Sequence, residues 1–585
     1  MKGLRRALVA VAAGLALADA SIVALALPPI LVEMDTTITG VAAVIGVYAL
    51  VLAVSIWPAA HVRVGPWGFA LFALASLGCG VAGSLEVLLG FRALQAVGGA
   101  AALIAAFSVL EAGESRSGRR LWIGAALIGT AAGPAIGGAL TELFDWRAIF
   151  FVQAPLALAA ALACVRREPA RVTANAPAQP ATAPPVERQQ SGGLWSHGDP
   201  VPSRATAPAP GADTARVADV DWEAEFAASP RAAPSPVWLA ALAFTAAAFT
   251  AVLFLLVIEL VAGFAMSPIE AALGVTVLPM AALAGAAIPG ERRPKAMAGS
   301  LLIAGGAASL AFLPEAAIAW TFIPQVLAGG GMGLALPAFS DERDIPEAAR
   351  NLIARHVGIV IVLAILAPVA TAQLQTATER AILQGAALVL DAQIDPLQKL
   401  KLAPALLDQV DVDGPRAGLT RNVEAKRAEF AADAAVYDRL AGRLDDVVVG
   451  AVQDAFRTAY LIAGALALLS ALLLVSAYRR PLVWAATAVA AATFFGYTVA
   501  HDSQAPAAVD LQDPCQEREL PDAGGFTGAI QNEALRLLDQ GACEVGTSRE
   551  ELALALFDRE RAKQFKLDHG VDPRSVGGLL SLLGG

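Results

Sequence analysis

Long apolar runs recur along this chain and restrict its fold more than any other feature. An α-helix needs about 20 such residues to cross a hydrocarbon core about 30 Å thick. Of the 585 residues, 57% are hydrophobic and 16% charged, too few polar residues to cover a water-soluble fold of this size. We therefore expect an all-α polytopic membrane protein. The candidate spans, about thirteen, are residues 7–32, 40–60, 67–85, 88–110, 121–142, 147–165, 236–262, 269–290, 296–313, 316–338, 351–373, 455–477 and 481–500.

Basic residues in the loops predict the orientation, because cytoplasmic loops carry an excess of Lys and Arg. With the N-terminus inside, almost every basic loop residue is cytoplasmic, and Arg147 is the exception. This pattern predicts a multi-pass plasma-membrane protein with a cytoplasmic N-terminus and an extracytoplasmic C-terminus. The residues that carry the pattern are Arg63, Arg116, Arg119, Arg120, Arg166, Arg167, Arg171, Arg292, Arg293, Lys295, Arg343, Arg350, Arg479 and Arg480.

A polar segment divides the helices into two groups. Residues 166–235 contain proline- and alanine-rich sequence such as NAPAQPATAPP, which cannot bury a core and predicts a disordered cytoplasmic linker. The linker separates a six-helix half, residues 1–165, from a second six-helix half, residues 236–477. A helical insertion at 374–454 is expected outside the membrane, where it either shapes access to the outer mouth or is simply a tolerated insertion. One extra span, within 478–500, follows the second half.

The tail, residues 501–585, is expected to form an extracytoplasmic domain that could bind an envelope protein. Its periodicity predicts helices near 526–541 and 548–566. Thr547 and Glu550 have the spacing of a capping box at the start of the second helix, in which each side chain satisfies a free backbone amide.

Two of the four cysteines, Cys515 and Cys543, lie in this tail. Their spacing matches no zinc-binding pattern. Because the space outside the bacterial cytoplasm is generally oxidising, we hypothesise a disulfide between them, with two unpaired thiols as the alternative. Cys79 and Cys164 lie in apolar spans and are expected to be packing residues.

Acidic residues inside the spans are candidates for function, because a charge at the bilayer centre costs about 2.5–3.5 kcal/mol on insertion scales. Asp19 lies within the first span and is a candidate for reversible protonation; a neutral, hydrogen-bonded structural aspartate is the alternative. Glu259 in the seventh span is a second candidate for proton coupling, or for attracting cations. Its alternative is an interfacial residue that reaches water.

Four further polar residues occur in the spans. Arg92 and Gln95 lie one turn apart on one helix face. Arg92 stays charged and needs an acidic or carbonyl partner inside a bundle, where it could favour ionisation of a nearby carboxylate; snorkelling to the outer interface is the alternative. Gln95, Gln153 and Gln325 are candidates for lining a cavity, contacting substrate or bridging helices.

The fifth span combines small residues with a proline: Gly129, Gly133, Pro134, Gly137 and Gly138. In a membrane such residues let two helices approach backbone to backbone, and neighbouring groups satisfy the carbonyl that proline leaves free. We expect this glycine face to form an interface with the other half of the protein, with simple packing as the alternative.

Several kinds of function have no support in the sequence. The net charge of −10 argues against nucleic-acid binding. No phosphate-binding loop, nucleophile triad or metal-ligand cluster is present. We therefore expect neither an enzyme nor a metal or organic cofactor.

The sequence DASIVALALP in the first span, RALQAVGGA in the fourth, and GTAAGPAIGGAL with DWRAIFFVQAP in the fifth and sixth together resemble the major facilitator superfamily. They are most similar to motifs of its drug/proton antiporters of the fourteen-helix type. The resemblance covers roughly residues 7–165, 236–373 and 455–477. It departs from the family between the second and third spans, where only Arg63 and Gly65 remain of the usual loop motif and Val62 occupies the aspartate position.

The resemblance implies a major facilitator fold and secondary transport, with proton-driven export of hydrophobic or amphipathic small molecules. A proton gradient would be the driving force, and the partners would be the bilayer, the substrate and protons. Asp19, with Glu259, would exchange protons, and Arg92 would influence the ionisation of these carboxylates. Two alternatives stay open. One is a transport-inactive relative that serves as an envelope scaffold, and the other is an exporter of envelope lipids.

Overall fold

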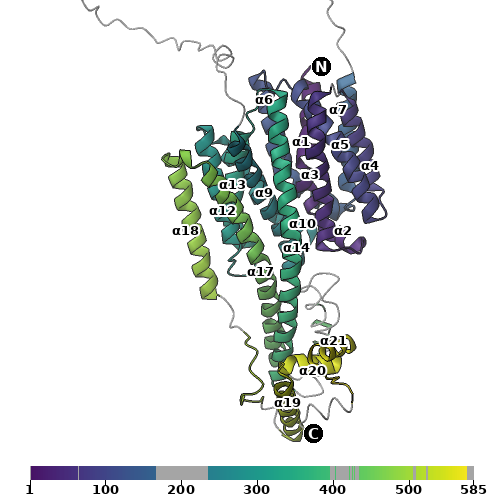
Figure 1. The fold of residues 1–585 in the computed structure, drawn as a ribbon, viewed down its shortest axis with the longest axis vertical. Coiled ribbons are helices and arrows are strands. Elements are labelled where there is room, and N and C mark those ends of the chain that lie inside the picture. Colours follow the sequence, from purple (N-terminus) through teal and green to yellow (C-terminus); the bar gives the residue numbers. More distant parts are fainter. Residues whose placement is uncertain are drawn as a thin grey trace, which may run out of the picture. The chain divides into compact units, whose positions relative to one another are not determined.

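The computed structural model describes residues 2–62, 65–165, 235–394, 434–504, 509–521 and 525–575, with single positions between 399 and 427. Every regular element in this described part is a helix (Figure 1). The linker predicted for residues 166–235 lies outside the described residues except for Ser235, and so does Arg63.

The helices of the first half follow one another closely. The first predicted span, 7–32, is two helices, because the backbone turns before Pro28. This proline lies in the first turn of the second helix, where no hydrogen bond is lost by its missing N–H. The elements are α1 (Lys2–Ala24), α2 (Leu27–Glu33), α3 (Ile38–His61), α4 (Trp67–Gly80), α5 (Leu85–Val109), α6 (Arg116–Leu143) and α7 (Ala148–Val165).

The second half repeats this plan with two irregular spans. Its first span ends in a π-helical turn, Glu259–Gly263, and its second is divided at Thr276. The elements are α9 (Pro236–Ile258), α10 (Pro268–Val275), α11 (Val277–Ala287), α12 (Arg292–Leu310), α13 (Ile318–Phe339), α14 (Ile345–Asp391), α17 (Ala434–Leu473) and α18 (Pro481–Gln504).

Nine helices of the described part are long and apolar enough to cross a membrane, and the two arms of α6 make a tenth if they count as one bent span. Helix α4 is apolar but shorter. The predicted all-α polytopic membrane fold is confirmed by these helices, whereas the number of thirteen crossings stays a prediction.

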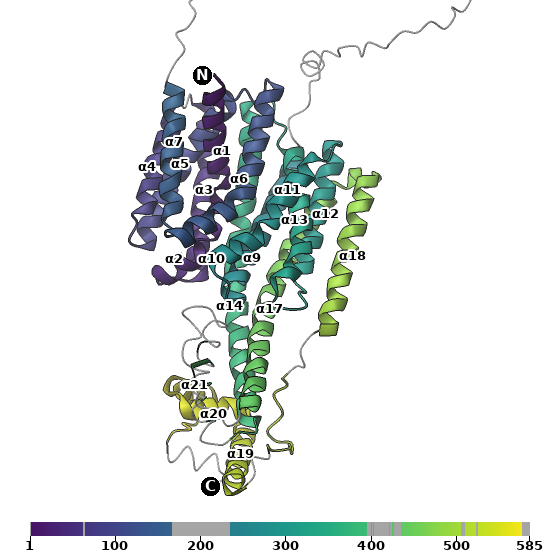
Figure 2. The same cartoon turned by 180° about the vertical axis from the view of Figure 1, so that it is seen from behind.

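The two halves meet through reciprocal contacts. Helix α6, fifth in the first half, packs on α10 and α11, which form the second span of the other half. Helix α14, fifth in the second half, packs on α3, the second span of the first half. Figures 1 and 2 show α1, α3, α4, α5 and α7 on one side and α9, α12, α13, α17 and α18 on the other. Matching contacts in both halves are what an internal repeat produces.

Apolar side chains from both halves form one continuous core. It contains Ile22 and Ile45 of the first half together with Val252, Leu256 and Val362 of the second, all buried. The extra helix α18 packs on α12 at the outer edge of the second half.

The two ends of the predicted insertion at 374–454 are continuations of two membrane helices. Helix α14 has 47 residues and α17 has 40. At 1.5 Å per residue they are about 70 and 60 Å long, well over the thickness of a hydrocarbon core. Their distal parts pack together through Leu388 and Val389 of α14 and Tyr437, Leu440 and Leu444 of α17. Neither helix is interrupted at the predicted boundaries.

The tail forms three helices, α19 (Gly525–Val545), α20 (Arg549–Phe557) and α21 (Arg559–His569). The structure joins Cys515 and Cys543 in a disulfide whose Cα atoms are 5.0 Å apart. The predicted capping box is wrong by one residue. Ser548, not Thr547, caps α20 by accepting a hydrogen bond from the backbone N–H of Glu551. The predicted helix 548–566 is two helices, because Asp558 ends α20 and caps α21.

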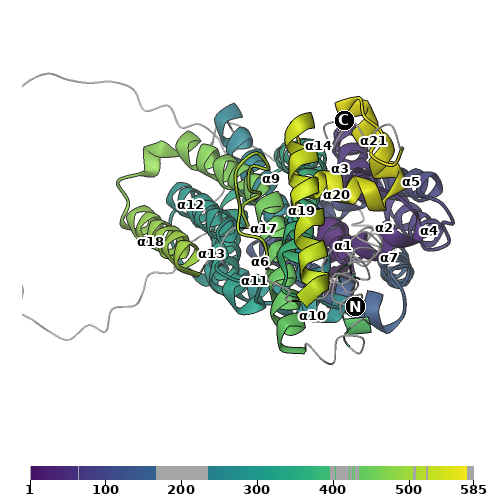
Figure 3. The same ribbon diagram turned by 90° about the horizontal axis from the view of Figure 1, so that it is seen from below.

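Helix α20 of the tail packs against α14 (Figure 3), and a charge cluster lies at this contact. Arg549 has no exposed surface, and its Nη2 lies 2.8 Å from Oδ1 of Asp391 and 3.0 Å from Oε1 of Glu550. Arg518 pairs with Asp539 at 3.1 Å. Burial raises the pKa of Asp539, and the two arginines act in the opposite direction. The tail is therefore held to α14 by the ion pair of Arg549, which is buried, with Asp391, whose side chain is about half exposed.

Candidate functional site

A buried ion pair lies inside the first half. Nη1 of Arg92 donates a 2.8 Å hydrogen bond to Oδ1 of Asp19, and Nη2 donates to Oδ2. Neither side chain has any exposed surface. Nε of Arg92 bonds the Val44 carbonyl at 3.0 Å, and its Cζ lies 4.4 Å from the centre of the Tyr48 ring. Snorkelling of Arg92 to the outer interface is therefore wrong, because the guanidinium faces the interior of the half.

Gln95 extends this ion pair into a network that joins four helices, α1, α4, α5 and α7. Its Oε1 accepts a 2.6 Å hydrogen bond from Nη1 of Arg92. Its Nε2 lies 2.8 Å from both Oγ of Ser76 on α4 and Oε1 of Gln153 on α7. Gln95 and Gln153 thus bridge helices, one of the roles considered from the sequence. The network holds Arg92 in a fixed position relative to Asp19.

Glu259 occupies a second buried site, at the π-helical turn that ends the seventh span. Only 1% of its surface is exposed, so the interfacial alternative is wrong. The Tyr460 hydroxyl on α17 donates a 2.6 Å hydrogen bond to Oε2 of Glu259. No cation of the described chain lies within ion-pair distance of this carboxylate. Asp19 and Glu259 therefore differ in chemistry, since one has a charged partner and the other a neutral one.

The second half also contains a hydroxyl cluster that sequence reasoning missed. Oγ1 of Thr245 lies 3.0 Å from Oγ of Ser300 and 2.8 Å from Oγ of Ser470. These residues belong to α9, α12 and α17, so the cluster joins three helices. Gln325 behaves differently, because its amide donates to Thr321 on its own helix and its Oε1 has no partner in the described part.

The glycines of the fifth span pack mainly on α1 of their own half. A Cβ atom on Gly129 would lie 2.2 Å from the Gly14 carbonyl oxygen, and one on Gly137 would lie 2.1 Å from the Ile22 carbonyl oxygen. Gly133 faces α1 in the same way. The expectation that this face meets the other half is therefore wrong for all three. Spacing of four residues identified one helix stripe but not the helix that covers it.

Gly138 lies next to this stripe and does meet the second half. A Cβ atom there would lie 2.3 Å from Cβ of Ala272 on α10. Between these contacts, Pro134 lacks the N–H that would bond the Thr130 carbonyl. The axis of α6 bends by 45° between Arg116–Thr130 and Ala132–Leu143. Helix α6 therefore combines close packing on its own half, a bend and a close contact with the other half.

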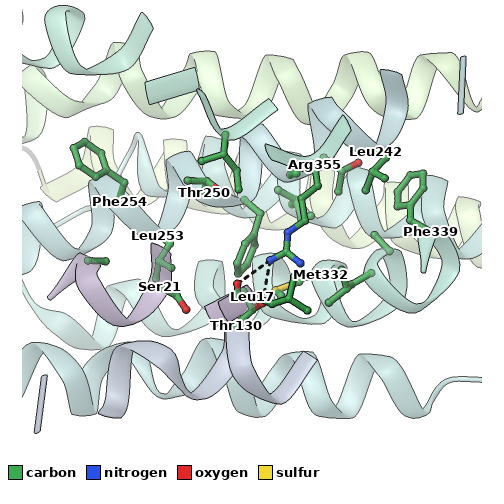
Figure 4. A pocket seen from close by; sticks show the side chains of 18 of the residues that line it. Leu17, Ser21, Thr130, Leu242, Thr250, Leu253, Phe254, Met332, Phe339 and Arg355 are labelled. Atoms are coloured by element: carbon green, nitrogen blue, oxygen red, sulfur yellow. Dashed lines mark hydrogen bonds between the residues drawn. The ribbon is translucent and has the colours of Figure 1, made fainter. Parts of the chain in front are cut away.

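A cavity lies between the two halves (Figure 4), where α1, α3 and α6 face α9, α12, α13 and α14. The described residues of its walls are largely apolar, with hydroxyls at four positions and one charged side chain, that of Arg355. The lining residues are Leu17, Ser21, Ala24, Ile45, Thr130, Leu242, Thr245, Ala246, Phe249, Thr250, Leu253, Phe254, Ile303, Met332, Ala335, Leu336, Phe339, Arg355 and Ile359.

The predicted site residues do not line this cavity. Gln95, Gln153 and Gln325 are absent from its walls, and so are Asp19 and Glu259. The positions two residues before and after Asp19, Leu17 and Ser21, do line it. Two residues correspond to about 200° around a helix. Asp19 therefore lies on the opposite face of α1, behind the cavity wall.

Arg355 is the cavity residue that sequence reasoning missed. It lies on α14, and its Nη2 donates to the Leu17 carbonyl at 3.3 Å and to Oγ1 of Thr130 at 3.1 Å (Figure 4). Arg355 is the fifth residue of the predicted span 351–373. This position could have identified it from the sequence, because a charge within a span is a functional candidate. Tyr460 gave no such signal, because a tyrosine in a span is ordinary.

Comparison with known proteins identifies related sequences. A sequence profile described as Major Facilitator Superfamily matches residues 9–341. The multidrug resistance protein Stp of Mycobacterium tuberculosis is 35% identical over 150 residues, which are 24% of this chain and 28% of that protein. The tetracenomycin C resistance and export protein of Streptomyces glaucescens is 34% identical over 169 residues, 27% of this chain and 31% of that one.

These alignments are partial, since the chain spans about three-tenths of the length of the two relatives. Among solved structures, a bacterial homologue of the human lysosomal transporter Spinster, in an inward-facing and unoccupied conformation, is similar. The comparison covers 82% of this chain and 99% of that one, with 17% sequence identity and a TM-score of 0.46.

Proposed function

We propose that this chain, which belongs to the Major Facilitator Superfamily and is a multi-pass membrane transporter of that group, exports amphipathic small molecules across the plasma membrane in exchange for protons. Relatives named for multidrug resistance and for tetracenomycin C export support the direction and the substrate class. The largely apolar cavity between the halves is the observation that carries the proposal, because such a site suits an amphipathic ligand.

Asp19 and Arg92 would couple protons to this transport. While Asp19 is ionised, its carboxylate neutralises Arg92 inside the first half. A proton on Asp19 would remove that charge, weaken the ion pair and leave a buried guanidinium that must find other partners. Because Leu17 and Ser21 lie on the same helix and line the cavity, a movement of α1 would reach the substrate site.

The reciprocal contacts between the halves would support alternating access. Helix α6 contacts α10 and α11, and α14 contacts α3, so one half can rock against the other along two matching contacts. The bend in α6 and the close approach of Gly138 to Ala272 would place one such contact near the cavity.

Dye efflux from vesicles with an imposed pH gradient tests this function. The parent should expel an amphipathic dye when the gradient is present and stop when an uncoupler removes it. Asp19→Asn should abolish gradient-driven efflux, and Asp19→Glu should restore part of it. Glu33→Gln is the matched control, because Glu33 is an acidic residue that is about half exposed and pairs with Arg147 instead. Efflux by Asp19→Asn equal to that of the parent would remove the proton role.

A transport-inactive envelope scaffold is the second candidate, favoured by the loop that has Val62 at the aspartate position and by the tail bound to α14. Deletion of residues 501–585 discriminates. A transporter should keep most of its flux, whereas a scaffold should lose a partner protein that co-purifies with the full chain.

A further inference from the structure

We propose that the molecules this chain transports carry an anionic group, and that Arg355 binds this group in the cavity between the halves. This substrate class rests on the function proposed above. The charge balance of the cavity, rather than the size of the cavity, supports this substrate class.

Among the described residues, Arg355 is the charged residue of the cavity wall, and no Asp or Glu shares that wall. Its Nη2 donates to two neutral acceptors, the Leu17 carbonyl and the Thr130 hydroxyl. No carboxylate of the described chain lies within 4.0 Å of its nitrogens. Of the five N–H groups of a guanidinium, those on Nε and Nη1 make no hydrogen bond to the described residues. The positive charge is therefore solvated only in part by the protein.

Arg92 shows what an arginine with a matched charge looks like in the same bundle. Its charge is matched by Asp19, and its Nε and both Nη atoms donate hydrogen bonds to buried acceptors. An arginine keeps its charge in a protein, and an unmatched charge within a membrane span is costly. The unmatched positive charge of Arg355 lies at the wall of a cavity, where a bound anion would neutralise it.

The rest of the wall determines the remainder of the ligand. Phe249, Leu253, Phe254, Met332 and Phe339 offer aromatic and aliphatic surface. A ligand that fits this cavity therefore has an apolar body and one anionic group. A guanidinium binds carboxylate and phosphate by paired, charge-assisted hydrogen bonds. The same charge disfavours lipophilic cations, so the cavity selects by repulsion as well as attraction.

Binding of an anion would also affect the contacts between helices. Arg355 belongs to α14 of the second half, and its two hydrogen-bond acceptors belong to α1 and α6 of the first half (Figure 4). Thr130 lies at the bend of α6. An anion that competes for the guanidinium would weaken a connection between the halves at the place where α6 bends.

A set of ten-carbon amphiphiles tests the charge preference. Decanoate, decyl phosphate, decyltrimethylammonium and decanol share one chain and differ in the head group. Equilibrium binding is measured on the full-length protein in lipid nanodiscs, with empty nanodiscs as the blank for partitioning. The two anions should bind at least about tenfold more tightly than the cation and the alcohol, since one charge-assisted hydrogen bond already accounts for that ratio.

Variants connect the preference to the residue. Arg355→Gln should abolish the preference for anions, and Arg355→Lys should keep most of it. Arg350→Gln is the matched control, because it removes the same charge from the same helix outside the cavity wall. If Arg355 only connected helices, Arg355→Gln would weaken binding of all four probes equally. That outcome in a folded variant overturns the proposal. A parent that binds the cation as tightly as the anions overturns it as well, even if the glutamine variant fails to fold.

A single-chain anionic phospholipid, added as a fifth probe, separates two sources of the anion. Tighter binding than decyl phosphate supports a lipid substrate, and weaker binding supports a smaller organic anion; both support the anionic site. Failure of the anionic site and failure of the proposed function give different experimental results. Anion preference without gradient-driven efflux would refute proton-coupled export alone, whereas gradient-driven efflux of cations without anion preference would refute the anionic site alone.

Discussion

Replacement of Arg92 by methionine tests the buried ion pair most directly. Methionine keeps a long, flexible side chain but removes the charge and the donors to Asp19. The Asp19 carboxylate would then remain in the interior of the first half with no exposed surface and no charged partner. The structure therefore predicts a large loss of stability.

The size of the loss has two bounds. Removing one partner of a buried ion pair costs about 3–5 kcal/mol. The carboxylate can instead take up a proton, which for an aspartate of ordinary pKa near 3.9 costs about 4 kcal/mol at pH 7. Where the bare carboxylate would cost more than the proton, Asp19 takes up the proton, and we then expect a loss of about 4 kcal/mol.

The loss should depend on pH with a definite sign. The folded variant would hold a proton on Asp19 that the unfolded chain releases at pH 7, so its stability rises as pH falls. The gain is about 1.4 kcal/mol for each pH unit between 7 and 5. The purified protein in detergent is unfolded by heat at pH 5, 6 and 7, and its tryptophan fluorescence is followed. The melting temperatures of variant and parent should converge at low pH.

Two variants complete the test. The double change Asp19→Asn with Arg92→Met should be more stable than Arg92→Met at pH 7 and should show no convergence. Arg147→Met removes one partner of a partly exposed ion pair with Glu33 and should cost less than about 1 kcal/mol. If Arg92→Met melts with the parent at pH 7, or if its deficit is the same at pH 5 and pH 7, the reasoning about Asp19 is refuted.

Three further changes have expected outcomes. Gly137→Val should lower the melting temperature markedly, because even its Cβ atom would overlap the Ile22 carbonyl oxygen. Burial raises the pKa of Glu342, in the loop between α13 and α14, to about 7. The parent therefore loses stability as pH rises from about 4.5 to 7, and Glu342→Gln should melt above the parent at pH 8 but not at pH 5. Cys515→Ser opens a loop with a sequence separation of 28 residues, which should cost the tail about 3–4 kcal/mol and expose it to limited proteolysis.

Each of these changes has a control and a contrary result. Gly124→Ala should be neutral, since nothing lies within 4 Å of its added methyl group; equal losses at both glycines would contradict the packing argument. Glu114→Gln, at an exposed position, should leave the pH profile of the melting temperature unchanged. If Glu342→Gln also leaves this profile unchanged, the argument about Glu342 is contradicted. Cys164→Ser is the control for Cys515→Ser, because it alters a free cysteine outside the tail. Two freely alkylated tail thiols without reductant would exclude the disulfide.

Much of the fold follows from local sequence. Hydropathy located the membrane helices, because each long apolar run has one low-energy solution in a bilayer, a helix with all its backbone groups hydrogen-bonded. It did not locate the breaks at Pro28 and Thr276, or the continuation of α14 and α17 beyond the apolar runs. Helix ends depend on neighbours and caps, as the shift from Thr547 to Ser548 shows.

Candidate site residues could be listed from the sequence but not grouped. Asp19, Arg92, Gln95 and Gln153 were each identified as polar residues in apolar spans. Their union in one network could not be predicted, because they lie on three helices, α1, α5 and α7, and Asp19 and Gln153 are 134 positions apart in the sequence. Arg355 was overlooked, because an arginine near the end of a span reads as a flanking cytoplasmic charge.

The sequence alone was enough to establish the all-α membrane fold, the family, and the polar and glycine residues that a bilayer tolerates only for a reason. These follow from transfer free energies and from local spacing, which are properties of single segments. The folded arrangement was needed to show that Asp19 pairs with Arg92, that three of the four glycines pack on α1 rather than on the other half, and that Arg355 lines the cavity with no acidic partner among the described residues. The physical reason is that pairing and charge balance depend on which faces of distant helices meet, and no single helix carries that information.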